Sequence, residues 1–241
     1  MILVIDIGNT KAHFGIYIKD KLSAHWSLLN SEIKRNNNII SVRLKEYNIL
    51  KCTISCVVPS LKDVFNKILD DFSLTPVFIE YSSIDIPIYY NNPSELGVDR
   101  IINVVAVIKL YEIPCIIVDF GTATTIDVVS DKGEFIGGVI VPGIGVSAET
   151  LWTKTEKLPH IEINKPKTVI GKNTIDCMQS GIFYGSIGQV DEIIKRIMKE
   201  LGYKTNVIAT GGLSNIIGKC SKYIKKVDEF LILEGLKILT R

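Results

Sequence analysis

The sequence predicts an α/β fold in which two duplicated lobes, each a mixed sheet flanked by helices, surround a central cleft. A short apolar strand that runs into an aspartate and a glycine-bearing turn occurs at residues 4–10 and again at 117–123, about half a chain length later. Strand-like and helix-like segments alternate after each copy. A chain of 241 residues, 46% of them apolar, is also long enough to bury a core in each half.

The first copy continues as a three-strand unit. An apolar segment at residues 14–18 leads into a tight turn at 19–21 and a third strand at 22–28. Periodicity then predicts a strand at 51–58, a helix at 61–72 and a second helix at 98–110. Because the last of these is apolar almost all round, we expect it to be buried between the halves.

The second copy repeats this order. An apolar segment at 126–129 is followed by a turn at 131–133 and a strand at 134–141. The remaining elements are a long helix at 173–201, a strand at 205–209 and a closing helix at 228–239. We therefore expect an N-terminal lobe at 1–112 and a C-terminal lobe at 113–241.

Charge and hydropathy exclude several classes of protein. A formal net charge of +2 argues against nucleic acid or an anionic membrane as the main partner. The densest basic cluster, formed by Lys219, Lys222, Lys225 and Lys226, is typical of a solvated face. No apolar run approaches the ~20 residues that a spanning helix needs, and no export signal is visible.

The five cysteines are odd in number and form no CxxC pair, which is typical of a reduced, cytoplasmic protein. Cys52 and Cys56 lie four residues apart on an expected strand and would face one side. Zinc is one interpretation of this pair, but no second ligand pair is visible. Buried thiols are the simpler interpretation.

The two glycine-bearing turns suit phosphate binding. Glycine lets the backbone approach a ligand closely, and Asn9, Thr10, Thr122, Thr124 and Thr125 can donate hydrogen bonds to phosphate oxygens. The carboxylates of Asp6 and Asp119 would instead hold a cation that offsets the phosphate charge. A plain β-turn capped by aspartate or threonine is the alternative, but two copies at matching places favour phosphate binding.

A third turn of this kind contains Gly211 and Gly212, after the strand at 205–209 and before an expected short helix. A double glycine there would let a flat ring or a ribose approach the backbone, although ordinary strand-to-helix turns also contain it. This layout resembles the actin and sugar-kinase superfamily, whose two phosphate turns and adenosine turn arise from duplicated actin/ribonuclease-H-like lobes. The chain has neither GxxxxGK[ST] nor GxGxxG.

More specific motifs resemble those of type III pantothenate kinases. Gly97, Val98, Asp99 and Arg100, with Asn103, match the G-x-D-R-x-x-N segment of that family, and residues 118–125 match its second phosphate turn. The family's other motifs follow in order at 137–138, 142–144, 158–159, 171–174 and 179–181. The resemblance implies ATP-dependent phosphorylation of pantothenate to 4'-phosphopantothenate, the first step of coenzyme A biosynthesis.

The resemblance also implies roles for single residues. Asp99 matches the catalytic base, and Arg100 matches a residue of the substrate site, where it is suited either to pair with the pantothenate carboxylate or to stabilise phosphate. The remaining substrate-binding residues would be Tyr90, Gly97, Val98 and Thr174. Capping of the following helix is the alternative for Asp99 and Arg100, and packing against residues 84–88 is the alternative for Tyr90.

The implied nucleotide and metal residues lie in the three turns. ATP would contact Asp6, Ile7, Gly8, Asn9, Thr10, Lys11, Thr122, Gly211 and Gly212. Asp6 would be the carboxylate on the Mg²⁺ side, and Asp119 would hold a monovalent cation, K⁺ or NH₄⁺. Lys11 departs from the family pattern. It would either add charge beside the phosphates or start a strand and point to solvent, and His13 reads as a strand residue.

The helix at 173–201 contains Gly181, Gly185 and Gly188, and each costs about 1 kcal/mol of helix propensity relative to alanine. Close packing within the chain or between subunits would offset that cost. The resemblance implies a homodimer whose pantothenate site lies at the interface. Two other functions stay open: a kinase for another small hydroxyl substrate or a nucleotide hydrolase on the same fold, and a non-catalytic nucleotide-binding regulator.

Overall fold

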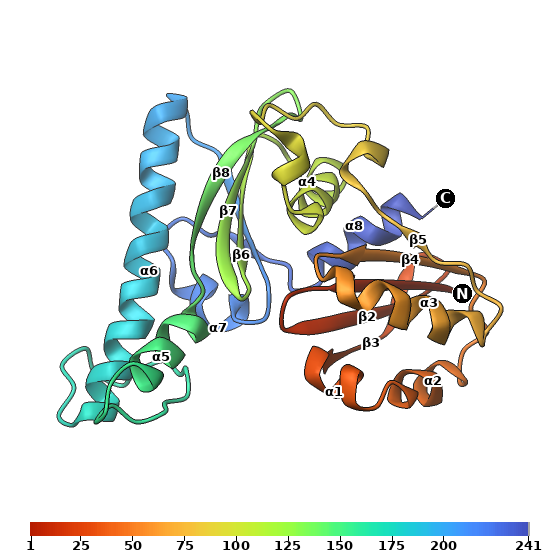
Figure 1. Ribbon diagram of the computed structural model, residues 1–241. Coiled ribbons are helices and arrows are strands. Elements are labelled where there is room, and N and C mark those ends of the chain that lie inside the picture. The colour runs from red at the N-terminus through yellow and green to blue at the C-terminus, as the bar shows by residue number, and fades with distance from the viewer. Residues whose placement is uncertain (241) are drawn as a thin grey trace. The chain divides into compact units, whose positions relative to one another are not determined.

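Two five-stranded sheets form the framework of the chain, one in each of two units (Figure 1). The structure is a computed structural model, and it describes residues 1–240. Unit 1 comprises Met1–Tyr111 and the C-terminal segment from Leu231, whereas unit 2 comprises Glu112–Phe230. The division expected from the sequence lies after residue 112. Residue 241, the last of the expected second lobe, lies outside the described residues.

The sheet of unit 1 has the strand order β3-β2-β1-β4-β5. Its first three strands form an antiparallel meander, and the last two run parallel to β1. The strands are β1 (Ile2–Ile7), β2 (Lys11–Ile18), β3 (Lys21–Leu29), β4 (Lys51–Cys56) and β5 (Val77–Phe78).

The sheet of unit 2 has the same topology, in the order β8-β7-β6-β9-β10. Here too an antiparallel meander is extended by two strands parallel to its first strand. The strands are β6 (Cys115–Phe120), β7 (Ala123–Val129), β8 (Phe135–Pro142), β9 (Asn206–Thr210) and β10 (Lys226–Val227). The predicted duplication of an α/β unit with a mixed sheet is confirmed.

Helices cover both faces of the first sheet. One face carries Leu3, Ile5 and Phe14, which pack with apolar residues of three short helices. These helices are α1 (Asn30–Arg35), α2 (Asn38–Leu44) and α3 (Lys62–Asp70), and short 3₁₀ turns lie at Pro59–Leu61, Tyr81–Ser83 and Pro93–Glu95. The other face is covered by α4 (Val98–Leu110) and α8 (Leu231–Leu239), which lie side by side (Figure 1).

The closing helix α8 belongs to unit 1, not to the second lobe in which its residues were expected. Gly235 lies so close to α4 that an added Cβ would collide with the Ile102 carbonyl oxygen. The Tyr17 hydroxyl donates a hydrogen bond to Glu234 Oε1 at 2.9 Å. Because Gly235, Ile102 and Tyr17 all come from buried positions, α8 is an integral part of the first core.

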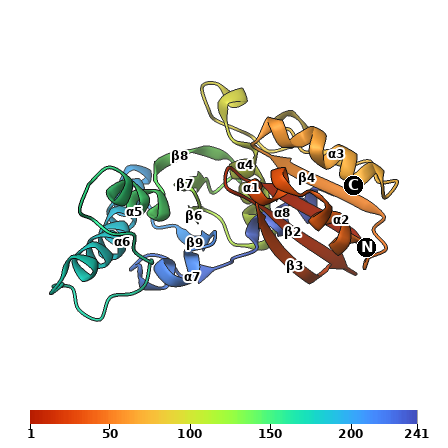
Figure 2. The same cartoon turned by 60° about the horizontal axis from the view of Figure 1, so that its bottom comes forward.

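Unit 2 contains the predicted long helix, α6 (Thr174–Leu201), with α5 (Ile144–Thr153) beside its N-terminal part in both views (Figures 1 and 2). Phe183, Val190 and Ile194 of α6 pack on the strands β6 and β7. The helix ends at Gly202, whose φ of 77° is the left-handed conformation that glycine favours. The short helix α7 (Ser214–Ile217) and a 3₁₀ turn (Gly218–Cys220) follow β9.

The cysteines behave as thiols. Cys52 packs in the core of unit 1, and burial raises its pKa to about 12, so the thiol stays protonated. Residues 1–240 contain no group of three or more histidine, cysteine or acidic side chains that could hold a metal ion. Within the same residues, no helix is both long and apolar enough to cross a membrane.

The close contact between α8 and α4 predicts that alanine destabilises the protein at Gly235 but not at a glycine with open surroundings. Gly235→Ala places a methyl group against the Ile102 backbone and should lower the free energy of unfolding by about 1–3 kcal/mol. Gly145→Ala in α5 is the control, because an added Cβ there meets no described atom within 4 Å. Urea denaturation of both variants measures the difference, and equal stabilities would contradict the assigned packing.

Candidate active site

The first candidate phosphate turn joins β1 to β2. The Gly8 N–H donates to the Lys11 carbonyl at 3.0 Å and closes the turn, which leaves Asn9 and Thr10 exposed. Lys11 is the first residue of β2 and is exposed. This agrees with the expectation that it starts a strand and points to solvent. Ile7 differs from its neighbours because its side chain is buried in the core, so it can approach a nucleotide only with its main chain.

Asp6 lies one residue before the end of β1, with only 9% of its surface exposed. It is in register with His13 on β2 and Ser55 on β4. Burial raises the pKa of the Cys56 thiol, and the negative charge of Asp6 adds to that shift. The Asp6 carboxylate thus acts at the end of β1 and β4 that carries the turn, where a cation would neutralise it.

The second group of unit 1 residues forms the start of α4. Asp99 Oδ1 accepts the Arg100 N–H at 2.8 Å, and Arg100 itself is 7% exposed. A Cβ added at Gly97 would come within 2.5 Å of Asp99 Oδ1, so a side chain there would displace the carboxylate from its place over the helix start. Val98 is half-buried beside them as the first helical residue.

Burial raises the pKa of the Asp99 carboxyl above its ordinary value. The hydrogen bond from the Arg100 N–H and the Arg100 guanidinium oppose this shift but do not cancel it. A carboxylate with a raised pKa binds a proton more readily than an exposed aspartate. Asp99 is therefore suited to accept a proton from a hydroxyl group.

In unit 2 the second phosphate turn and the adenosine turn lie against each other. Asp119 on β6 is in register with Thr125 on β7 and Thr210 on β9. Gly211 has a φ of 88°, and an added Cβ would collide with Asp119 Oδ1. Gly212 is open, since a Cβ there would meet no described atom within 4 Å. The structure thus brings three predicted site residues of unit 2 together.

The second phosphate turn is held by the glycine that follows β8. The Gly143 N–H donates to the Thr122 carbonyl at 3.1 Å, and an added Cβ at Gly143 would overlap that oxygen. Thr122 is exposed. Gly143 was not among the expected site residues, although its Pro-Gly motif was one of those that resembled the family.

The two remaining substrate residues lie on exposed segments. Thr174 is the first residue of α6, and Asn173 caps that helix by accepting the Asp176 N–H at 2.9 Å. Gly171 approaches the same turn so closely that a Cβ would collide with the Cys177 N–H. Tyr90 is 37% exposed, in the loop between two 3₁₀ turns of unit 1.

Asp6 and Asp119 have the chemistry of cation ligands. Mg²⁺ in phosphoryl-transfer sites is typically held by one or two carboxylates, with phosphate oxygens and water completing its shell. A single carboxylate beside each phosphate turn fits that pattern.

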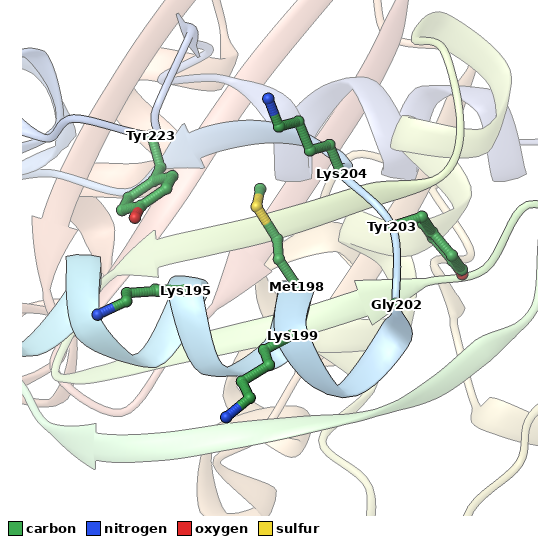
Figure 3. A pocket seen from close by; sticks show the side chains of 7 residues that line it. All are labelled: Lys195, Met198, Lys199, Gly202, Tyr203, Lys204 and Tyr223. Atoms are coloured by element: carbon green, nitrogen blue, oxygen red, sulfur yellow. The ribbon is translucent and has the colours of Figure 1, made fainter.

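A separate hollow lies at the C-terminal end of α6 (Figure 3). It is lined by Lys195, Met198, Lys199, Gly202, Tyr203, Lys204 and Tyr223. None of these is a predicted site residue, and no carboxylate lines the hollow. This hollow therefore contains none of the side chains that the sequence predicts for phosphoryl transfer.

One residue beside the first turn was not singled out from the sequence. The Asn30 side-chain amide donates to the carbonyls of Gly8 and Asn9, at 2.8 and 3.0 Å. Asn30 is about twenty residues from the turn and begins α1, so its local sequence carries no sign of this contact.

The raised pKa of Asp99 predicts a pH-dependent cost to stability. Because the folded state binds this proton more tightly than the unfolded state, stability falls as the pH rises from the ordinary aspartate pKa through the raised one. Asp99→Asn removes the titration. Its unfolding free energy, relative to that of the unchanged protein, should therefore rise from about pH 4 towards neutrality. Urea denaturation across this range measures the difference, and a pH-independent difference would contradict the shift.

Comparison with known proteins assigns the chain. A family model described as type III pantothenate kinase matches residues 2–196. A type III pantothenate kinase of Koribacter versatilis is 42% identical, over 99% of this chain and 94% of that protein. That of Halalkalibacterium halodurans is 45% identical, over 99% and 98%.

A solved structure adds to the comparison at the level of the fold. The inorganic polyphosphate/ATP-glucomannokinase from Arthrobacter sp. strain KM is similar with a TM-score of 0.50, at 11% identity over 98% of this chain and 96% of that one. At that identity the likeness concerns the fold alone, and it agrees with the predicted sugar-kinase-like lobes. With the family model matching most of its length and relatives above 40% identity, this chain belongs to the type III pantothenate kinase family.

Proposed function

We propose that this protein transfers the γ-phosphoryl group of ATP to pantothenate, giving 4'-phosphopantothenate and ADP as the first step of coenzyme A biosynthesis. The observation that carries this proposal is the Gly97–Arg100 segment. In a chain that belongs to the pantothenate kinase family, it sets a carboxylate with a raised pKa and a buried guanidinium at the start of one helix.

Asp99 is the proposed base. As the primary hydroxyl oxygen of pantothenate bonds to the γ-phosphorus, the bond from that phosphorus to the bridging oxygen breaks and ADP leaves. The hydroxyl proton passes to the Asp99 carboxylate and then to solvent. Because phosphoryl transfer has a loose transition state, Asp99 contributes mainly by orienting the hydroxyl.

Arg100 is the proposed anchor for the substrate carboxylate. A guanidinium binds a carboxylate through two parallel hydrogen bonds, which fixes both the distance and the direction of the bound molecule. Arg100 is 7% exposed, so little of its surface is left to water. Tyr90 and Thr174 are proposed as further substrate contacts by their match to the family.

The three turns are proposed as the nucleotide site. The backbone N–H groups of Asn9 and Thr10 and the hydroxyls of Thr10 and Thr122 would donate to the phosphates, with Gly8 and Lys11 nearby. The open backbone of Gly212, with Gly211 directly before it in the turn, would receive the adenosine. Mg²⁺ held by Asp6, and K⁺ or NH₄⁺ held by Asp119, would offset the phosphate charge when bound.

We also propose a homodimer with the pantothenate site at its interface. An added Cβ at Gly181, Gly185 or Gly188 would meet no atom of residues 1–240 within 4 Å. The close packing that would offset their helix cost is thus not supplied by the described chain. These glycines follow one another at spacings of four and three, which puts them on one face of α6. A second copy of the chain is the partner that the family suggests.

The assay for this function is ADP release from ATP and Mg²⁺, with and without pantothenate, in potassium and then in sodium buffer. We expect release that needs pantothenate and is faster in potassium. Asp99→Asn should lower kcat by roughly 10²- to 10⁴-fold while ATP binding persists.

The same assay separates the alternatives. ADP release that is indifferent to pantothenate would indicate another acceptor or a hydrolase. Binding of ATP without any turnover would indicate a non-catalytic regulator. Equal rates in sodium and potassium would contradict the proposed monovalent cation at Asp119.

The dimer is tested by light scattering after gel filtration. Gly185→Leu puts a branched side chain on the glycine face and should convert the dimer to monomer. Gln189→Leu is the control, since it adds the same side chain at an exposed position of the same helix that is turned by about 100° from Gly188. A monomeric unchanged protein, or dimer loss in both variants, would contradict the proposed interface.

A further inference from the structure

We propose that Asn30 is a positioning residue that orients the first phosphate turn for nucleotide binding. The proposal rests on the proposed ATP site at that turn. Asn30 directly follows β3. Among the described residues, its side chain forms hydrogen bonds to Gly8 and Asn9 and none to Asp99 or the second phosphate turn. Asn30 would therefore affect the reaction indirectly, by fixing the conformation of the first phosphate turn.

Asn30 binds three successive carbonyl groups of the turn. Its Nδ2 donates to the Gly8 oxygen at 2.8 Å and to the Asn9 oxygen at 3.0 Å. Its backbone N–H donates to the Thr10 oxygen at 2.9 Å. Asn30 is 7% exposed, so these bonds are shielded from competition with water. One buried residue thus holds the carbonyl side of the whole turn.

The carbonyl directions determine where the turn's N–H groups point. In a planar trans peptide the C=O of one residue and the N–H of the next point in opposite directions. Because the Gly8 and Asn9 carbonyls face Asn30, the N–H groups of Asn9 and Thr10 face the opposite side of the turn. That side offers donors to an anion, whereas a carbonyl rotated towards it would repel a phosphate oxygen.

The amide side chain of Asn30 meets this requirement because its NH₂ group carries two donors. Both partners of Nδ2 are carbonyl oxygens, which accept but do not donate, so the amide orientation of Asn30 is fixed by them. Oδ1 is buried and has no hydrogen-bond partner among the described residues. A buried amide that leaves its own oxygen unsatisfied in order to hold a turn suggests a role for the turn's shape beyond simple packing.

A neighbouring contact supplies the control. Glu32 Oε2 accepts the Leu29 N–H at 2.9 Å and so stabilises the same junction of β3 and α1. It makes no hydrogen bond to Gly8, Asn9 or Thr10 in the described structure. Glu32→Ala therefore loosens the start of α1 without removing a bond to the turn.

The experiment compares Asn30→Ala, Asn30→Asp and Glu32→Ala in the full chain. Calorimetry measures Mg·ADP and Mg·ATP binding, steady-state kinetics give KM for ATP and for pantothenate, and thermal unfolding gives Tm. We expect Asn30→Ala to weaken nucleotide binding and raise the KM for ATP about 10-fold, with KM for pantothenate within about twofold. Asn30→Asp should be worse, because its carboxylate faces two carbonyl oxygens.

The control separates positioning from stability. Glu32→Ala should lower Tm and leave nucleotide affinity unchanged. If Asn30→Ala and Glu32→Ala lower Tm alike and neither changes nucleotide affinity, Asn30 is merely structural and the proposal is overturned. Nucleotide binding that depends on Asn30, in a protein that does not turn over pantothenate, would overturn only the proposed function. An unchanged protein that binds no nucleotide would overturn both.

Discussion

The candidate site depends on the parallel pairing of β4 with β1 and of β9 with β6. Each pairing adds a strand to an antiparallel hairpin so that its carboxyl end lies beside the end of the hairpin's first strand. Asp6 thereby comes into register with Ser55, and Asp119 with Thr210. Loops after both strands then leave the sheet at one edge, where ligands bind in α/β sheets of this kind.

This arrangement places carboxyl groups at positions where burial disfavours their ionised form. Asp6 is 9% exposed, and the pKa of Asp99 is raised by burial despite the Arg100 guanidinium beside it. Removing a carboxylate from water costs free energy unless a cation or donors compensate. A Mg²⁺–nucleotide complex would supply positive charge at Asp6, and a substrate hydroxyl would supply a proton at Asp99. Under the proposed function, the nucleotide complex and the substrate would each stabilise one of these carboxylates further.

Much of this organisation could be predicted because it is local in sequence. The repeated strand–turn pattern, the alternation of elements and the long helix α6 all follow from short-range periodicity. The assignment of α8 to unit 1 could not be predicted, because it depends on the contact of Gly235 with Ile102, far apart in the chain. Asn30 was missed for the same reason, since its partners are turn carbonyls that leave no trace in the side-chain pattern around it.

The surroundings of individual glycines differ in ways that the sequence motifs do not reveal. Gly97 lies within contact of the Asp99 carboxylate, and Gly211 lies against that of Asp119, so the same device occurs once in each unit. In both places the absence of a side chain lets a carboxylate occupy space beside the backbone. The sequence does not distinguish Gly185 from these two glycines, yet a Cβ added at Gly185 would meet no described atom within 4 Å. A side chain at Gly97 or Gly211 would displace the carboxylate beside it, whereas a Cβ at Gly185 would have no such neighbour in the described chain.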